Sequence, residues 1–122
     1  MASSMESDGS KMSQEAKRTI EEWILDDASS DYLDFWIIWV IVTRVIPGLV
    51  EAEIGSTALD SIVRLLEHER LRAGELVPPG EFVAWPIPTA EAIRRIRVRV
   101  SSLQGPPQPG DVAYFELRDH VK

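Results

Sequence analysis

DYLDFWIIWVIVTRVIPG, residues 31–48, is the most hydrophobic stretch of this 122-residue chain. It holds eight consecutive apolar residues, Phe35 to Val42, and two of the four tryptophans. Its β-branched residues favour a strand, but the run continues to Ile46 without a turn residue, a length of about four helical turns. Asp31 is suited to cap such a helix, and Pro47-Gly48 supplies a stop signal. We therefore predict a helix here, with the core built against it.

The environment of this helix follows from its length. A helix that is apolar on all sides is either buried or lies in a membrane. A membrane-spanning helix needs roughly 20 apolar residues, whereas Asp34 and Arg44 bracket only nine residues here. The stretch therefore predicts a central core helix. The alternative is a helix with a partly exposed apolar face that forms a dimer or binds a partner.

Length and composition indicate one small domain. We predict that residues 13–122 form this domain and that residues 1–12, rich in small polar side chains, form a disordered tail. The first residues contain no apolar run of the kind found in a signal peptide. A cytoplasmic protein without a membrane segment is the resulting expectation.

The residue types available restrict the chemistry. The chain has no cysteine, which excludes disulfides, thiolate metal sites and cysteine nucleophiles. Its two histidines, His68 and His120, lie too far apart for a metal-binding spacing. We find no catalytic triad motif and no glycine-rich phosphate loop. We therefore expect no enzyme activity, no cofactor and no metal.

Further helices are predicted on both sides of the central one. Ser13 is suited to cap a helix that runs to about Asp26. After Pro47-Gly48 we predict a short helical segment that ends at Gly55. Ser56 or Thr57 would then cap an amphipathic helix that runs to about Arg72 and ends at Gly74.

The C-terminal third combines strands with one more helix. Pro79-Gly80 predicts a type II turn within a short hairpin that ends at Trp85. Thr89 is suited to cap a helix that runs to Leu103. Alternation over 112–117 predicts a strand that pairs with the hairpin. The fold class predicted for the whole chain is α+β, mainly α: a helical bundle with a small antiparallel sheet.

Residues 53–77, EIGSTALDSIVRLLEHERLRAGELV, resemble the second and third helices and the first wing strand of a winged helix. The resemblance covers about residues 31–85 and implies DNA binding by the helix after Gly55. The chain as a whole also resembles small uncharacterised bacterial proteins that end in a Gly-Asp followed by an aromatic-rich strand, here GDVAYFEL. That second likeness implies no activity.

The charge is acidic and uneven, with a net charge of −7. An acidic protein repels nucleic acid and attracts basic partners. Our first hypothesis is a non-catalytic interaction module that binds a basic protein through an acidic surface, as immunity proteins and antitoxins do by analogy. The predicted partner-binding residues are Glu51, Glu53, Asp60, Glu67, Asp26 and Asp27.

The alternative hypothesis is a winged-helix transcriptional regulator that binds DNA, although the charge makes nucleic acid an unfavourable partner. It would be a homodimer, paired through Ile20, Trp23 and Ile24 of the first helix. Its predicted DNA-binding residues are Arg64, Arg94, Arg95, Arg97 and Arg99. The favoured alternative for the last four is a solvated face that balances the acidic N-terminal helix through intramolecular ion pairs.

Overall fold

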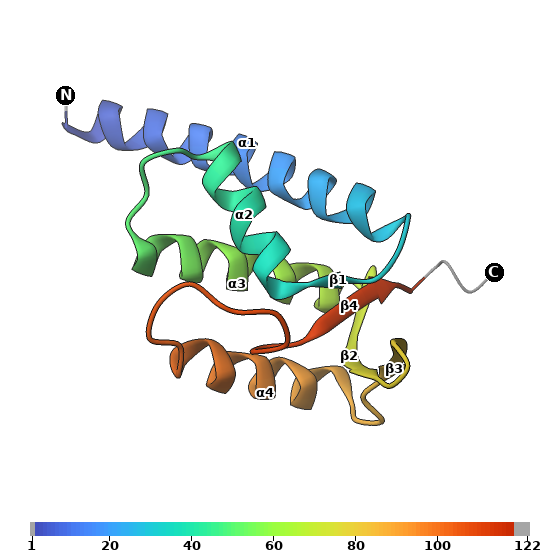
Figure 1. Cartoon of the computed structure of the whole chain (residues 1–122). Helices are drawn as coiled ribbons and strands as arrows, with labels where there is room; N and C mark the ends of the chain where they lie inside the picture. Colours follow the sequence, from blue (N-terminus) through green and yellow to red (C-terminus); the bar gives the residue numbers. More distant parts are fainter. Residues whose placement is uncertain (1, 119–122) are drawn as a thin grey trace.

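The computed structural model of the protein describes the backbone of residues 2–118 and the side chains of residues 14–118. Within this range the chain forms four helices and four strands. In chain order they are α1 (Ala2–Ala28), β1 (Leu33–Asp34), α2 (Phe35–Val45), α3 (Glu51–Glu67), β2 (Leu71–Val77), β3 (Glu81–Ala84), α4 (Thr89–Ser101) and β4 (Tyr114–Leu117) (Figure 1). The fold is α+β and mainly α, as predicted.

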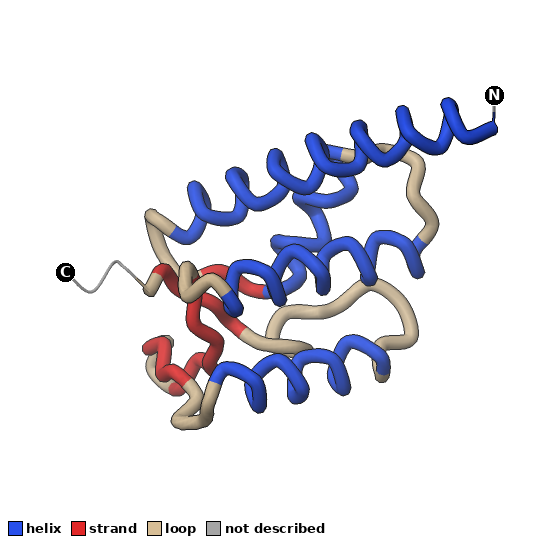
Figure 2. Tube along the Cα trace, turned by 180° about the vertical axis from the view of Figure 1, so that it is seen from behind, coloured by secondary structure: helices blue, strands red, loops and turns tan. Residues whose placement is uncertain are grey.

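The helices form a bundle with the strands gathered at one end of it (Figure 2). α3 lies between α1 and α4 and packs against both, and α2 packs against α1 and α3 (Figure 1). The sheet has the order β1-β4-β2-β3, and all of its neighbouring strands are antiparallel. β4 therefore pairs with the hairpin strand β2, which confirms the predicted pairing.

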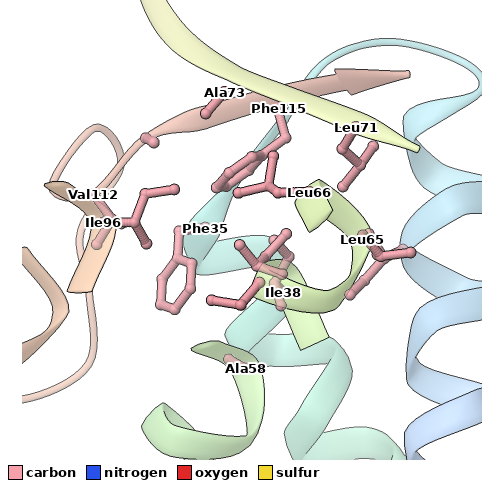
Figure 3. Close-up of a cluster of buried hydrophobic side chains, with 14 of the residues drawn as sticks. Phe35, Ile38, Ala58, Leu65, Leu66, Leu71, Ala73, Ile96, Val112 and Phe115 are labelled. Atoms are coloured by element: carbon pink, nitrogen blue, oxygen red, sulfur yellow. The ribbon is translucent and has the colours of Figure 1, made fainter. Parts of the chain in front are cut away.

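The core forms against α2, as the sequence predicts. Phe35 and Ile38 of α2 meet Leu66 of α3, Ile96 of α4 and Phe115 of β4 in one buried cluster (Figure 3). Four of these five side chains are fully inaccessible to solvent, and Leu66 is almost so. Each such side chain contributes about 1.5–3 kcal/mol through removal of apolar surface from water. The predicted central core helix is confirmed.

Asp34, and not Asp31, caps α2. The Asp34 carboxylate accepts a hydrogen bond from the backbone N–H of Trp36, at 3.2 Å. The backbone remains extended through Asp34 because Leu33 and Asp34 pair with Phe115 and Tyr114 of β4. The helix can therefore begin only at Phe35, and the prediction of an Asp31 cap is wrong.

Gly55 does not interrupt α3, which is one continuous helix from Glu51 to Glu67. Gly55 is buried, and a Cβ at this position would lie 3.4 Å from a carbon of the Trp39 ring. That distance is an ordinary van der Waals contact, so the indole of Trp39 packs directly against α3 at this position. The predicted break at Gly55 with a cap at Ser56 or Thr57 is wrong because tertiary packing outweighs the low helix propensity of glycine.

Gly74 lies within β2 and does not end a helix. A Cβ at Gly74 would lie only 2.2 Å from the carbonyl oxygen of Val83 in β3, so the close approach of the two strands requires glycine. α3 ends at Glu67, and the left-handed residue after it is Glu69, with φ +58°. The predicted helix to Arg72 with a cap at Gly74 is therefore wrong.

Two smaller predictions also change. The hairpin turn is closed by a hydrogen bond from the Gly80 N–H to the Val77 carbonyl, at 2.7 Å, which puts Pro78-Pro79 at its centre. The predicted type II turn centred on Pro79-Gly80 is therefore wrong. The residue before α4 is Pro88, and Thr89 is its first helical residue without a side-chain cap.

The apolar face of α1 packs into the core of the protein. Ile20 and Ile24 are fully buried in the core, whereas Trp23 is 45% exposed. Ile20 and Ile24 are therefore not available to pair across a dimer interface, and that part of the prediction is wrong. α1 begins at Ala2 and not at Ser13. The disorder predicted for residues 1–12 and the homodimer itself stay predictions.

Candidate functional site

Three of the predicted partner-binding residues lie at regular intervals on the outer side of α3. Glu53, Asp60 and Glu67 are all exposed and follow one another every seven residues. Seven residues are just under two helical turns and rise about 10 Å, so the three carboxylates lie along one side of the helix. We call this set the acidic α3 face.

Arg64 lies among these carboxylates in the sequence but is directed toward α1. Its Nε donates to Oε2 of Glu21 at 2.7 Å, which forms an ion pair between the two helices. Such an exposed pair contributes little to stability. The pair does, however, neutralise Arg64, which is the only basic residue of α3.

Glu51 lies apart from the acidic α3 face, in the first turn of α3. It lines a hollow of about 400 Å³ between α3 and α4, together with Trp39, Leu59 and Val100. Arg97 of α4 lines the same hollow. The structure thus places one residue from each predicted site set at a shared, largely apolar depression.

The four arginines of α4 divide into two groups, one with internal partners and one exposed. Arg95 and Arg99 are half-buried over Trp85, with their Cζ atoms 4.5 and 5.3 Å from its ring centroid. Arg99 also donates to the carbonyl of Val112 at 2.8 Å and is paired with Glu75 at 3.4 Å. Arg94 and Arg97 are exposed. Two of the four arginines of this cluster therefore have internal partners.

Asp26 and Asp27 lie in the last turn of α1 and are both exposed. Asp27 lines a second hollow, of about 310 Å³. The wall of this hollow also includes Tyr32, Asp34, Trp36 and Tyr114. We call it the aromatic hollow. It forms where the end of α1, the start of α2 and β4 meet.

The aromatic rings of this hollow are held at a right angle. Tyr32 and Tyr114 have centroids 5.9 Å apart and an angle of 82° between their planes. The pairing of Asp34 with Tyr114 across β1 and β4 brings these two segments together. Trp36 follows in the first turn of α2 and is 39% exposed.

The carboxylates of the hollow have different surroundings. Asp34 is only 7% exposed, and its oxygens accept from the N–H groups of Trp36 and Gly110, at 3.2 and 2.9 Å. Burial, followed by the negative charge of Asp34 and a hydrogen bond to it, raises the pKa of the Tyr114 hydroxyl. Asp27 is exposed and so remains free to contact a ligand.

The sequence predicted Asp27 as a site residue but missed the three aromatic residues beside it. Tyr32, Trp36 and Tyr114 lie in two segments far apart in the chain. Their only signal in the sequence was a pair of tyrosines in segments predicted as helix and strand. The register between β1 and β4, which a local pattern does not contain, brings them together.

Metal chemistry has no support among the described residues. Within residues 14–118, whose side chains the structure describes, no group of three or more His, Cys, Asp or Glu side chains is placed to hold a metal ion. His68 is exposed and immediately follows α3. His120 lies outside the described residues.

Comparison of the chain with protein-family models, with curated proteins and with solved structures finds no match. In the part of the chain that the structure describes, no helix has the length and apolar character needed to cross a membrane. We therefore infer function from the acidic α3 face, the arginines and the aromatic hollow.

Proposed function

We propose that this protein is a non-catalytic interaction module that binds a basic protein partner through the acidic α3 face. The observation that carries the proposal is the exposure of Glu53, Asp60 and Glu67 along one side of α3, with Arg64 ion-paired to Glu21. The three carboxylates span about 20 Å of helix. That length is comparable with one side of a protein interface of ordinary size.

The electrostatics favour a basic partner. The net charge is −7, so a protein rich in Lys and Arg is attracted from a distance. Exposed charges at an interface mainly accelerate association, and salt weakens this effect. Immunity proteins and antitoxins that neutralise basic nucleases use the same physics, and the comparison with them is an analogy. Asp26, Asp27 and Glu51 extend the negative field beyond the acidic α3 face.

Charge reversal tests the proposal. In the triple variant Glu53→Lys, Asp60→Lys, Glu67→Lys each change adds two positive charges, so the net charge rises from −7 to −1. A matched control reverses Glu22, Glu81 and Glu91, which are exposed and lie on α1, β3 and α4. Each set contains one residue from a helix first turn, Glu53 or Glu91, and Glu67→Lys places a positive charge at the last residue of α3, where the helix dipole favours it.

The measurement is affinity capture from native lysate, with and without nuclease, followed by association kinetics with the captured protein. We expect the unmodified protein and the control variant to retain one stoichiometric basic protein after nuclease treatment. The α3 variant should lose it, or associate at least about tenfold more slowly with a flatter dependence on salt. Equal association rates for the α3 variant and the unmodified protein would overturn the proposal.

The winged-helix regulator is the less supported function. Phosphate contacts by Lys and Arg supply most of the affinity for DNA. Arg64, Arg95 and Arg99 have internal partners, which leaves Arg94 and Arg97 on an acidic protein. The regulator would bind duplex DNA with an affinity that falls steeply with salt. Nucleic acid recovered in the capture, and lost on nuclease treatment, would favour it.

A further inference from the structure

The aromatic hollow has the composition of a site for an organic cation. A cation within about 6 Å of an aromatic ring face is attracted by the ring quadrupole, most strongly by tryptophan. Tyr32 and Tyr114 stand at 82° to each other, and Trp36 belongs to the same wall. In this edge-to-face pair the edge of one ring meets the face of the other, and both tyrosines line the hollow. The hollow thus combines three aromatic side chains within a space of about 310 Å³.

Its charge also selects a cation. Asp27 and Asp34 line the hollow, and among the described residues no Lys, Arg or His does so. Asp34 is 7% exposed, and within residues 14–118 it forms no ion pair. A buried carboxylate of this kind acts through a low local dielectric and is weakly screened. Burial, and after it the negative charge of Asp34, raises the pKa of the Tyr114 hydroxyl.

The hydrogen-bonding capacity narrows the class of cation. Both oxygens of Asp34 already accept from backbone N–H groups and Asp34 is only 7% exposed, so the exposed Asp27 is the more accessible acceptor. An unmodified ammonium has three N–H donors and a guanidinium has five, and each donor needs an acceptor when it leaves water. An alkylated ammonium has fewer donors or none, and aromatic rings replace its weak hydration well.

The size of the hollow indicates the head of a side chain. A volume of about 310 Å³ is at the small end of the range for ligand sites, roughly 300–1,000 Å³. We propose that the aromatic hollow binds the methylated ammonium group of a lysine side chain on the basic partner. The proposal rests on the proposed function for the source of the lysine and deepens it by naming a modified residue.

The binding test uses blocked amino acids as probes and two-dimensional 1H–15N NMR as readout. The indole N–H of Trp36 is assigned by its loss in Trp36→Phe. The probes are blocked trimethyllysine, its neutral analogue in which carbon replaces the charged nitrogen, and tetramethylammonium. We expect trimethyllysine to shift the Trp36 indole signal and to bind about tenfold or more tightly than the neutral analogue, since cation–π attraction and Asp27 act only on the charged form.

Variants separate binding from folding. Trp36→Ala should abolish the binding of blocked trimethyllysine, and Asp27→Asn should weaken it several-fold. Trp23→Ala is the matched control because Trp23 is also an exposed tryptophan, at 45% against 39% for Trp36, but does not line the hollow. It should bind like the unmodified protein. Well-dispersed spectra of each variant establish that it is folded.

Each contrary result has one meaning. Equal binding of the neutral analogue, or no shift of the Trp36 indole signal with any probe, overturns the cation site. Tetramethylammonium that binds as tightly as trimethyllysine overturns the assignment to a lysine side chain and indicates a small free ammonium. The α3 charge-reversal variant should still bind blocked trimethyllysine, so loss of partner capture in that variant and loss of probe binding in Trp36→Ala report on separate proposals.

Discussion

Two places in this protein combine aromatic rings with charged side chains, and they differ in where the cation comes from. At Trp85 the chain supplies it: Arg95 and Arg99 lie over the ring, and Glu75 accepts from both the Trp85 indole N–H and Arg99, at 2.9 and 3.4 Å. At the aromatic hollow the rings and the carboxylates are present, but among the described residues no base lines it.

The two sites therefore serve different purposes in physical terms. Trp85 is buried and fully partnered, so its interactions stabilise the junction of the hairpin with α4. Trp36 is exposed, although an exposed indole forgoes much of the hydrophobic stabilisation that it would gain by burial. Tryptophan is also enriched among the residues that dominate binding to a partner. The same residue types thus complete the fold at Trp85 and leave a ring accessible to a ligand at Trp36.

The first prediction contrasts the two tryptophans directly. Trp85→Ala should lower the free energy of unfolding by about 3–5 kcal/mol, because a buried indole is lost and Glu75 loses a donor. Trp36→Ala should cost only about 1 kcal/mol because much of its ring is already in water. Urea unfolding at neutral pH measures both values.

A Trp85→Phe variant serves as the control for the first prediction, since it retains a ring under Arg95 and Arg99 but removes the N–H that binds Glu75. Its cost should lie between those of the two alanine variants. Similar unfolding free energies for Trp85→Ala and Trp36→Ala would remove the distinction between the two sites.

The second prediction concerns the hairpin that carries Trp85. Gly74→Ala should cost about 1–3 kcal/mol, because a Cβ would lie 2.2 Å from the Val83 carbonyl oxygen and 2.8 Å from the Ala84 Cα. Both of these close contacts are to backbone atoms of β3, so an added Cβ would displace β3 and, with it, the adjacent Trp85. Gly55→Ala is the matched control, and it should be neutral or stabilise by up to about 1 kcal/mol through helix propensity. Thermal unfolding measures the stability of both variants. Equal stabilities of Gly74→Ala and Gly55→Ala would contradict the close approach of β2 and β3 at Gly74.

The third prediction is the smallest and concerns the electrostatics of the aromatic hollow. The pKa of Tyr114 is raised above 10.0 in the folded state, so the native protein keeps this proton at a pH where the unfolded chain has lost it. The stability that this contributes is complete below about pH 10 and is lost as the pH rises through the folded pKa.

Tyr114→Phe removes that contribution. The difference in unfolding free energy between the unmodified protein and Tyr114→Phe should therefore shrink as the pH rises from about 8 to about 11. The other titrating groups are common to both proteins and cancel in the difference. Urea unfolding at several pH values measures it, and a difference that stays constant over this range would show that Asp34 and burial do not act on Tyr114.

The sequence predicts the elements of this fold better than their ends. The helix at α2, the hairpin and the final strand follow from apolar periodicity and turn residues, and the structure contains all three. Two of the errors concern glycines, since Gly55 and Gly74 were both interpreted as helix breaks. Each is instead required or tolerated because of a neighbour distant in sequence: the Trp39 ring for Gly55 and the β3 backbone for Gly74.

The candidate sites divide in the same way. The exposure of Asp60 and Glu67 follows from the helical periodicity of one predicted segment. The alignment of Glu53 with them requires α3 to continue through Gly55, which was interpreted as a break. The internal partners of Arg64, Arg95 and Arg99 depend on contacts between elements, and the sequence left these arginines open between DNA binding and ion pairing. The aromatic hollow was missed because it requires strand register as well as element positions.

The pairing of β1 with β4 also has a consequence for the order of folding. It joins Leu33 to Phe115 and therefore closes most of the described chain into a loop. Contacts between residues so far apart carry the largest loop-closure entropy and form after local helices and hairpins. Tyr32 and Tyr114 meet only at that step. The aromatic hollow is thus a property of the completed fold, and no peptide cut from either segment can reproduce it.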